Sequence, residues 1–189
     1  MSEETFHILG IPGSLRAGSY NRALLLAAAE VLSPGVSLDV FTLNDIPPYN
    51  ADVQAQGDPE PVQELKQRLM EADAVLIATP EYNYSIPGVL KNAIDWASRP
   101  PKTCAFRKKP VGIIGASSGE SGTMRGQLAI LQVFVFLDSY VMGQPELRVT
   151  NAGQRFDDRG ALIDEELRER LRAYVTALIE WARLVGRAS

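Results

Sequence analysis

The sequence contains one cysteine, Cys104, and one histidine, His7, among its 189 residues. A single cysteine excludes an intramolecular disulfide and fits a reducing, cytoplasmic compartment. So few thiol and imidazole groups argue against a zinc or copper site. The acidic runs at 157–158 and 164–166 are typical of a turn and of the first turn of a helix. The sequence therefore predicts no metal site.

Positive charge and long apolar runs are also scarce. The formal net charge is −4, which gives no general attraction for a nucleic-acid backbone. The basic cluster at 107–109 is expected to be a solvated loop before a strand. No apolar run approaches the roughly 18 residues that span a bilayer, and the N-terminus lacks a signal-peptide pattern. We therefore expect neither a nucleic acid nor a membrane as partner.

Short apolar segments alternate with helical patterns along the whole chain. Strands are predicted at 6–11, 36–43, 74–79, 110–116 and, in one or two pieces, 141–149. Helices are predicted at 20–32, 61–71, 87–97, 122–137 and 163–185. This alternation predicts a parallel sheet with right-handed crossovers. The segment 44–60, rich in proline and glycine, is expected to be a long loop. Without a linker, residues 1–189 are expected to form a single domain.

A glycine- and hydroxyl-rich loop, residues 13–22, follows the first predicted strand and leads into a helix. Its backbone N–H groups, the positive helix end and Arg16 together suit an anion, most naturally a terminal phosphate. A plain strand-to-helix turn with Ser19 as N-cap is an equally open interpretation. Gly13 and Gly18 have P-loop spacing, but the required lysine is absent, and the dinucleotide glycine pattern is absent too. The loop therefore fits a monophosphate better than a triphosphate or pyrophosphate.

Two further polar loops should meet the first, because the carboxyl ends of parallel strands share one sheet edge, where ligands bind. The loop after the third strand offers Tyr82 and Tyr84, which suit a flat heteroaromatic ring. The loop after the fourth strand matches the G-x-S-x-G nucleophile pattern around Ser117. Such a nucleophile needs a histidine later in the chain, and His7 lies far upstream. A serine hydrolase is therefore a weak hypothesis, and the favoured use of this loop is to meet the polar edge of a bound ring.

The segment 79–96 reads TPEYNYSIPGVLKNAIDW. Together with Gly-Ser-Leu-Arg at 13–16 and Ser-Tyr-Asn at 19–21, it resembles the NADPH-dependent FMN reductase family, and in particular its bacterial chromate and quinone reductases. The resemblance covers residues 6–149. It is highly specific in the segment 79–96, moderately specific in the first loop, and looser over 117–125.

The resemblance implies a flavodoxin-like, doubly wound α/β fold with a five-stranded parallel sheet of order 2-1-3-4-5 and helices on both faces. It places FMN at the edge where the three loops meet. The residues implied for the phosphate are Ser14, Arg16, Ser19 and Asn21, with Tyr20 in the same motif; those for the isoalloxazine are Pro80, Glu81, Tyr82 and Asn83, with Tyr84 and Ser85 nearby; and those for the pyrimidine edge are Ser117 and Gly119. No catalytic residue is implied, because the redox chemistry belongs to the cofactor. Glu81 receives a place in the site but no chemical role.

The implied activity is that of an NAD(P)H-dependent FMN oxidoreductase. Hydride would pass from NADPH or NADH to FMN and then to quinones, flavins, azo compounds or chromate, with ping-pong kinetics if donor and acceptor share one face. The sequence does not decide between NADPH and NADH. A flavodoxin-like electron carrier without its own hydride donor remains an alternative. The resemblance also implies a homodimer or homotetramer, and the apolar stretch 129–137 fits an interface or a helix buried on the sheet.

Overall fold

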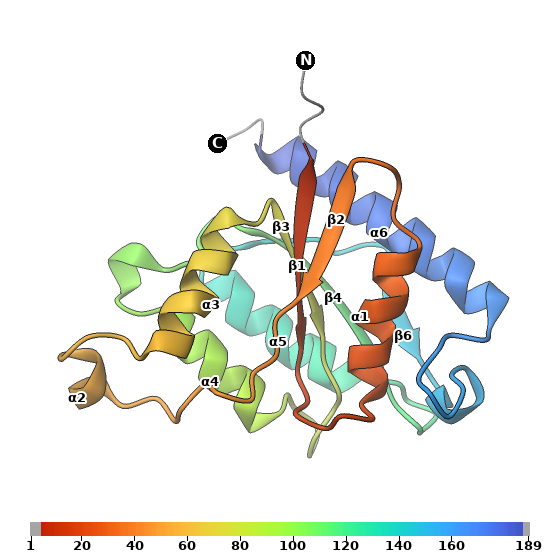
Figure 1. Cartoon of the computed structure of the whole chain (residues 1–189), viewed down its shortest axis with the longest axis horizontal. Coiled ribbons are helices and arrows are strands. Elements are labelled where there is room, and N and C mark those ends of the chain that lie inside the picture. The colour runs from red at the N-terminus through yellow and green to blue at the C-terminus, as the bar shows by residue number, and fades with distance from the viewer. Residues whose placement is uncertain (1–4, 187–189) are drawn as a thin grey trace.

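The computed structural model describes residues 5–186 as a parallel sheet with helices on both faces (Figure 1). The strands are β1 (Phe6–Pro12), β2 (Val36–Val40), β3 (Ala74–Ala78), β4 (Pro110–Ala116), β5 (Tyr140–Val141) and β6 (Leu147–Val149). Their order is β2-β1-β3-β4-β5, and β6 also pairs with β4. All these pairs are parallel. The predicted order 2-1-3-4-5 is confirmed, with the fifth strand in two short pieces.

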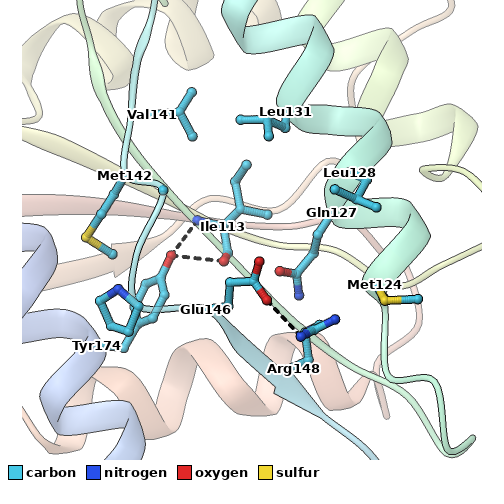
Figure 2. Close-up of a pocket in the computed structure, with 12 residues that line it drawn as sticks. Ile113, Met124, Gln127, Leu128, Leu131, Val141, Met142, Glu146, Arg148 and Tyr174 are labelled. Carbon is cyan, nitrogen blue, oxygen red and sulfur yellow. Dashed lines mark hydrogen bonds and ion pairs between the residues drawn. The ribbon is translucent and has the colours of Figure 1, made fainter.

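The break between β5 and β6 leaves part of β4 without a strand neighbour. β5 pairs with Pro110 and Val111, and β6 pairs with β4 only from Ile114 onward. In the gap, the hydroxyl of Tyr174 accepts a hydrogen bond from Ile113 N at 2.7 Å and donates one to Ile113 O at 2.9 Å (Figure 2). Burial raises the pKa of the Tyr174 hydroxyl well above its usual value, so the phenol stays protonated. A helical side chain thus satisfies the backbone groups that the interrupted strand cannot reach.

Two helices cover one face of the sheet and three cover the other (Figure 1). α1 (Tyr20–Glu30) and α6 (Glu165–Gly186) share one apolar core with the sheet. α3 (Glu60–Glu71), α4 (Gly88–Ala97) and α5 (Met124–Phe136) share the other. Along β1, Ile8 points into the first core, whereas Leu9 and Ile11 point into the second. This alternation is the period-two pattern of a strand that is buried on both sides.

The remaining elements are short. α2 (Ala51–Gln54) lies in the segment 44–60, so the prediction of an uninterrupted loop there was wrong in this detail. Asn50 explains the helix, because its side-chain oxygen accepts a hydrogen bond from Asp52 N at 2.8 Å and caps the first turn. Two 3-10 turns, η1 (Pro101–Thr103) and η2 (Ala152–Gln154), complete the elements. Over residues 5–186, no helix has the length and apolar character needed to span a bilayer.

The parallel strands bring three loops to a single edge of the sheet, at the bottom of Figure 1. These loops follow β1, β3 and β4, as the sequence predicted. β1, β3 and β4 are neighbours in the sheet, so the loops that leave them lie side by side.

Candidate functional site

The loops after β1, β3 and β4 line a common hollow of about 210 Å³. Its lining residues are Ser14, Arg16, Ser19, Tyr20, Asn21, Pro80, Glu81, Tyr82, Ala116, Ser117 and Ser118. Most residues predicted for the site are therefore brought together. Asn83, Tyr84, Ser85 and Gly119 lie outside the lining, on the loops that flank it, and Ala116 and Ser118 line it without having been predicted. Ala116 ends a buried strand, so only its position at the carboxyl end could have indicated it.

The loop after β1 presents a cation without a partner. Within residues 5–186, the Arg16 guanidinium makes no hydrogen bond or ion pair with another side chain or with the backbone. The backbone of Arg16 holds the turn, since Ser19 N donates to Arg16 O at 3.1 Å. Ser19 also caps α1, because its side chain accepts a weak hydrogen bond from Arg22 N at 3.4 Å. An unpaired guanidinium beside hydroxyl groups and a helix N-terminus fits a phosphate.

Asn21 connects the start of α1 to the end of β4. Its Nδ2 donates to Ala116 O and its Oδ1 accepts from Ala116 N, each at 2.9 Å, and the residue is 3% exposed. Both ends of this amide are engaged by one backbone position 95 residues away. Asn21 thus fixes the end of the loop after β1 relative to the end of β4, while its predicted contact with a phosphate stays a prediction.

Ser117 lies at the end of β4 without a histidine nearby. Its hydroxyl accepts a hydrogen bond from Gly119 N at 3.0 Å, which forms a local turn. His7 sits near the start of β1, where its ring nitrogen Nδ1 lies 3.1 Å from the Ser37 hydroxyl. Because β1 and β4 run in the same direction, His7 and Ser117 lie at opposite edges of the sheet. The serine hydrolase hypothesis therefore has no base in this structure.

The loop after β3 is a tight hairpin. Tyr82 and Ser85 exchange two backbone hydrogen bonds, each of 2.9 Å, and the two residues between them have positive φ, 50° at Asn83 and 66° at Tyr84. These angles are those of a two-residue I′ turn. Asparagine tolerates the left-handed region, but tyrosine adopts it rarely. The turn leaves Tyr82 47% and Tyr84 73% exposed, so it presents aromatic surface to solvent beside the hollow.

Glu81 fastens this hairpin to α5. Its carboxylate accepts hydrogen bonds from Arg125 N at 2.9 Å, from Gly126 N at 3.3 Å and from the Arg125 guanidinium. Burial opposes ionisation of the carboxyl, but these hydrogen bonds outweigh it and hold the pKa of Glu81 below its ordinary value. Arg125 in turn lies over the Tyr84 ring, with its guanidinium carbon 4.0 Å from the ring centroid. No role was predicted for Arg125, since nothing in the local sequence pattern relates it to a loop 44 residues earlier.

A second hollow, of about 220 Å³, lies between α5 and the segment 141–148 (Figure 2). Its walls are mainly apolar, with Leu128 and Leu131 on the α5 side, and an ion pair of 2.8 Å between Glu146 and Arg148 at one side. It shares no lining residue with the hollow between the loops. The first hollow therefore collects the hydroxyl and guanidinium groups, and the second collects apolar surface.

Comparison with known proteins gives consistent results for sequence and structure. A family profile described as NADPH-dependent FMN reductase matches residues 6–154. An NAD(P)H-dependent FMN reductase of Pseudomonas aeruginosa is 48% identical over 176 residues, which cover 93% of this chain and 95% of that protein. A quinone reductase of Pseudomonas putida is 38% identical, with 96% of this chain and 97% of that protein covered. Among solved structures, the flavoenzyme NAD(P)H:(acceptor) oxidoreductase FerB of Paracoccus denitrificans superposes with a TM-score of 0.86 at 32% identity, covering 94% of this chain and 97% of that one.

Proposed function

Because this chain belongs to the NADPH-dependent FMN reductase family, we propose that it reduces quinones with NAD(P)H, using FMN held in the hollow between the loops after β1, β3 and β4. It is an NAD(P)H-dependent oxidoreductase with FMN as cofactor. The alternative of an electron carrier is set aside, because the relatives are named as reductases that use NAD(P)H. When bound, FMN supplies the hydride and electron chemistry that no amino-acid side chain provides.

The observation that carries the proposed site is the unpaired Arg16 guanidinium in the hollow. FMN has a phosphate at one end and a flat ring at the other. Arg16, Ser14 and Ser19 lie where the phosphate would be held, at the N-terminus of α1. Pro80 and Tyr82 line the same hollow from the hairpin side and would contact the ring. The donor groups and the aromatic surface present thus fit both ends of the cofactor.

The loop after β4 would complete the ring contacts. Ser117 lines the hollow, and the backbone N–H of Gly119 is used within its own turn by the Ser117 hydroxyl. Donors at this loop would face the pyrimidine edge of the ring, where hydrogen bonds stabilise negative charge. The protein would therefore bind FMN, orient it and adjust its electronic properties, and it would need no acid–base pair of side chains.

The acceptor range that we propose is broad: quinones first, and also flavins, azo compounds and chromate. Tyr82 and Tyr84 remain largely exposed and offer a stacking surface with few specific polar contacts. If the donor and the acceptor occupy this same surface in turn, the kinetics are ping-pong. Initial rates with NADPH and a benzoquinone then give parallel double-reciprocal lines, whereas intersecting lines would contradict a shared surface.

The test of the function itself is anaerobic mixing of the FMN-loaded protein with NADPH, followed by a benzoquinone. We expect the flavin absorbance to bleach on the first addition and to return on the second. Parallel mixing with NADH gives the donor preference. A protein whose bound FMN bleaches with neither NADPH nor NADH would be an electron carrier and not a reductase.

We further propose that a second copy of the chain packs on α5, to give a homodimer or homotetramer. Leu128, which lines the apolar hollow of Figure 2, is 55% exposed, and Val135 and Phe136, further along the same helix, are 66% and 87% exposed. Large apolar side chains that gather exposed on one helix are typical of interaction sites. Sedimentation velocity should show an oligomer that Leu128→Glu dissociates, while Leu184→Glu, at an exposed position of α6, leaves it intact.

We place the protein in the cytoplasm, in keeping with the unpaired thiol of Cys104.

A further inference from the structure

Glu81 lines the hollow, but its carboxylate is committed to the first turn of α5. We propose that Glu81 is a positioning residue that fixes the flavin-ring loop, residues 80–85, to α5 and, through Arg125, holds the ring of Tyr84 at the mouth of the site. This inference rests on the proposed FMN site. It gives Glu81 a task other than contact with the cofactor.

The first turn of α5 needs a partner of this kind. Its N-cap residue, Thr123, makes no side-chain capping hydrogen bond. The amides of Arg125 and Gly126 belong to the group at a helix start that has no partner within the helix. Glu81 satisfies both from a separate loop, and its negative charge lies at the positive end of the helix. A carboxylate that is only 11% exposed thus replaces the missing cap.

Gly126 allows the loop and the helix to approach at backbone distance. A Cβ atom at this position would lie 3.3 Å from Pro80 O, 3.3 Å from Ser85 O and 3.4 Å from Glu81 Cα. Both ends of the hairpin therefore rest on the first turn of α5. This contact is independent of the Glu81 carboxylate and points to the same function, which is a fixed relation between the ring loop and the helix.

Arg125 extends the connection to the tip of the hairpin. Its guanidinium is held by Glu81 and lies over Tyr84, at one of the two positive-φ positions of the turn. A cation over an aromatic face is attracted by the negative charge of the ring face. That attraction offsets part of the cost of a tyrosine in the left-handed region. The chain from Glu81 to Arg125 to Tyr84 thus sets the geometry of the ring loop before any ligand binds.

The experiment that tests this inference distinguishes effects on binding of the flavin ring from effects on binding of the phosphate. FMN and riboflavin, which lacks the phosphate, are titrated into cofactor-free protein, and flavin fluorescence gives each dissociation constant. We expect Glu81→Gln to weaken both ligands by about tenfold, because the lost charge-assisted bonds serve the ring loop. The matched control is Glu180→Gln, at an exposed position on α6, which should change neither constant.

Three results would overturn the inference: unchanged constants in Glu81→Gln, weakening of FMN alone, or an unchanged visible circular dichroism spectrum of FMN bound to the variant. The last readout reports the ring environment, which a general loss of stability does not alter. Failure of the wild-type protein to bind FMN would instead contradict the proposed function.

A second variant keeps the test valid if Glu81→Gln folds poorly. Arg125→Met leaves the backbone amides of α5 capped by Glu81 and removes the guanidinium, and with it one hydrogen bond to Glu81 and the contact with the Tyr84 ring. We expect it to weaken riboflavin by about threefold, in line with the loss of one exposed cation–aromatic contact. In the double variant the two effects should combine to less than their product, because Glu81 acts partly through Arg125. Effects that multiply fully would show that the two residues act separately and would overturn the connection.

Discussion

Two of the three loops that line the candidate site, those after β1 and β3, differ in how firmly the fold holds them. The loop after β1 is mostly exposed from Leu15 to Gly18, and a Cβ atom at Gly18 would meet nothing within 4 Å. The loop after β3 is a closed hairpin that Glu81 and Gly126 fasten to α5. Both belong to the same sheet edge, so the difference arises from their own contacts.

This difference matches what each end of FMN requires. Attraction between a guanidinium and a phosphate falls slowly with distance, so a loop with a few local hydrogen bonds is sufficient for the phosphate. Contact with a flat ring requires a surface at a fixed place, and a loop that is ordered in advance avoids the entropy cost of ordering on binding. We therefore expect the loop after β1, residues 13–19, which we call the phosphate loop after its proposed ligand, to tolerate changes of backbone and the ring loop, residues 80–85, to tolerate few.

The largest expected effect is a loss of folding stability in Gly115→Ala. Gly115 lies in β4, beside the point where β3 leads into the ring loop. A Cβ atom at this position would lie 1.9 Å from the Thr123 hydroxyl oxygen and 2.5 Å from Thr79 O, where β3, β4 and the start of α5 meet. Overpacking of a well-filled region costs about 1–3 kcal/mol and sometimes more, so we expect about 3 kcal/mol. For a chain of this length that corresponds to a fall in Tm of about 6–12 °C. Thermal unfolding followed by circular dichroism measures it.

Gly18→Ala on the phosphate loop is the matched control. A Cβ atom at this position would meet nothing within 4 Å, and the backbone of Gly18 is not in the left-handed region. A glycine-to-alanine change at a compatible site leaves stability unchanged or raises it by about 0.4–1 kcal/mol. Equal losses of Tm in the two variants would contradict the contrast between the loops.

The sequence predicted the parts of the fold that short-range patterns specify. The apolar run of β3 has all five residues buried, and this run together with the prolines before α3 and α4 sets the element boundaries to within one or two positions. Physical proximity of the three loops followed from parallel strands alone. The resemblance to a known family then supplied the strand order and the names of the site residues.

The remaining features depend on side-chain directions that only tertiary packing fixes. Glu81 reaches Arg125 across 44 residues, and Asn21 reaches Ala116 across 95. Neither contact leaves a periodic signal in the sequence. Similarly, the sequence allowed for a fifth strand in two pieces, but it did not indicate that Tyr174 on α6 would bond to the backbone of β4 in the gap. Long-range polar contacts thus hold the site together, and they are the features that are hardest to predict from the sequence.

The second prediction concerns the phosphate side. Arg16→Ala removes an unpaired guanidinium, so it breaks no side-chain hydrogen bond or ion pair among the described residues. A hydrogen bond to a charged group contributes about 1.5–3 kcal/mol, so FMN should bind about one to two powers of ten more weakly. Riboflavin, without a phosphate, should bind as it does to the wild type. Equilibrium titration of both ligands checks this, and a loss of riboflavin affinity would place Arg16 at the ring instead.

The smallest expected effect is a pH dependence of folding stability, which we expect from Glu81 in the ring loop and not from Arg16 in the loop after β1. Hydrogen bonds from Arg125 and Gly126 lower the folded-state pKa of Glu81 below the ordinary value of 4.5, although burial acts in the opposite direction. A carboxyl with a lowered folded pKa stabilises the protein fully above its unfolded pKa, and this contribution is lost as pH falls through the folded one. The stability difference between cofactor-free wild type and Glu81→Gln should therefore be constant above about pH 5 and shrink below it. The corresponding difference for Arg16→Ala should stay flat, because Arg16 has no ion-pair partner among residues 5–186. Urea unfolding midpoints from about pH 3 to pH 6 measure both differences. A flat profile for Glu81→Gln would mean that its charge does not hold the ring loop, and the contrast between the two sides would then rest on the hairpin and Gly126 alone.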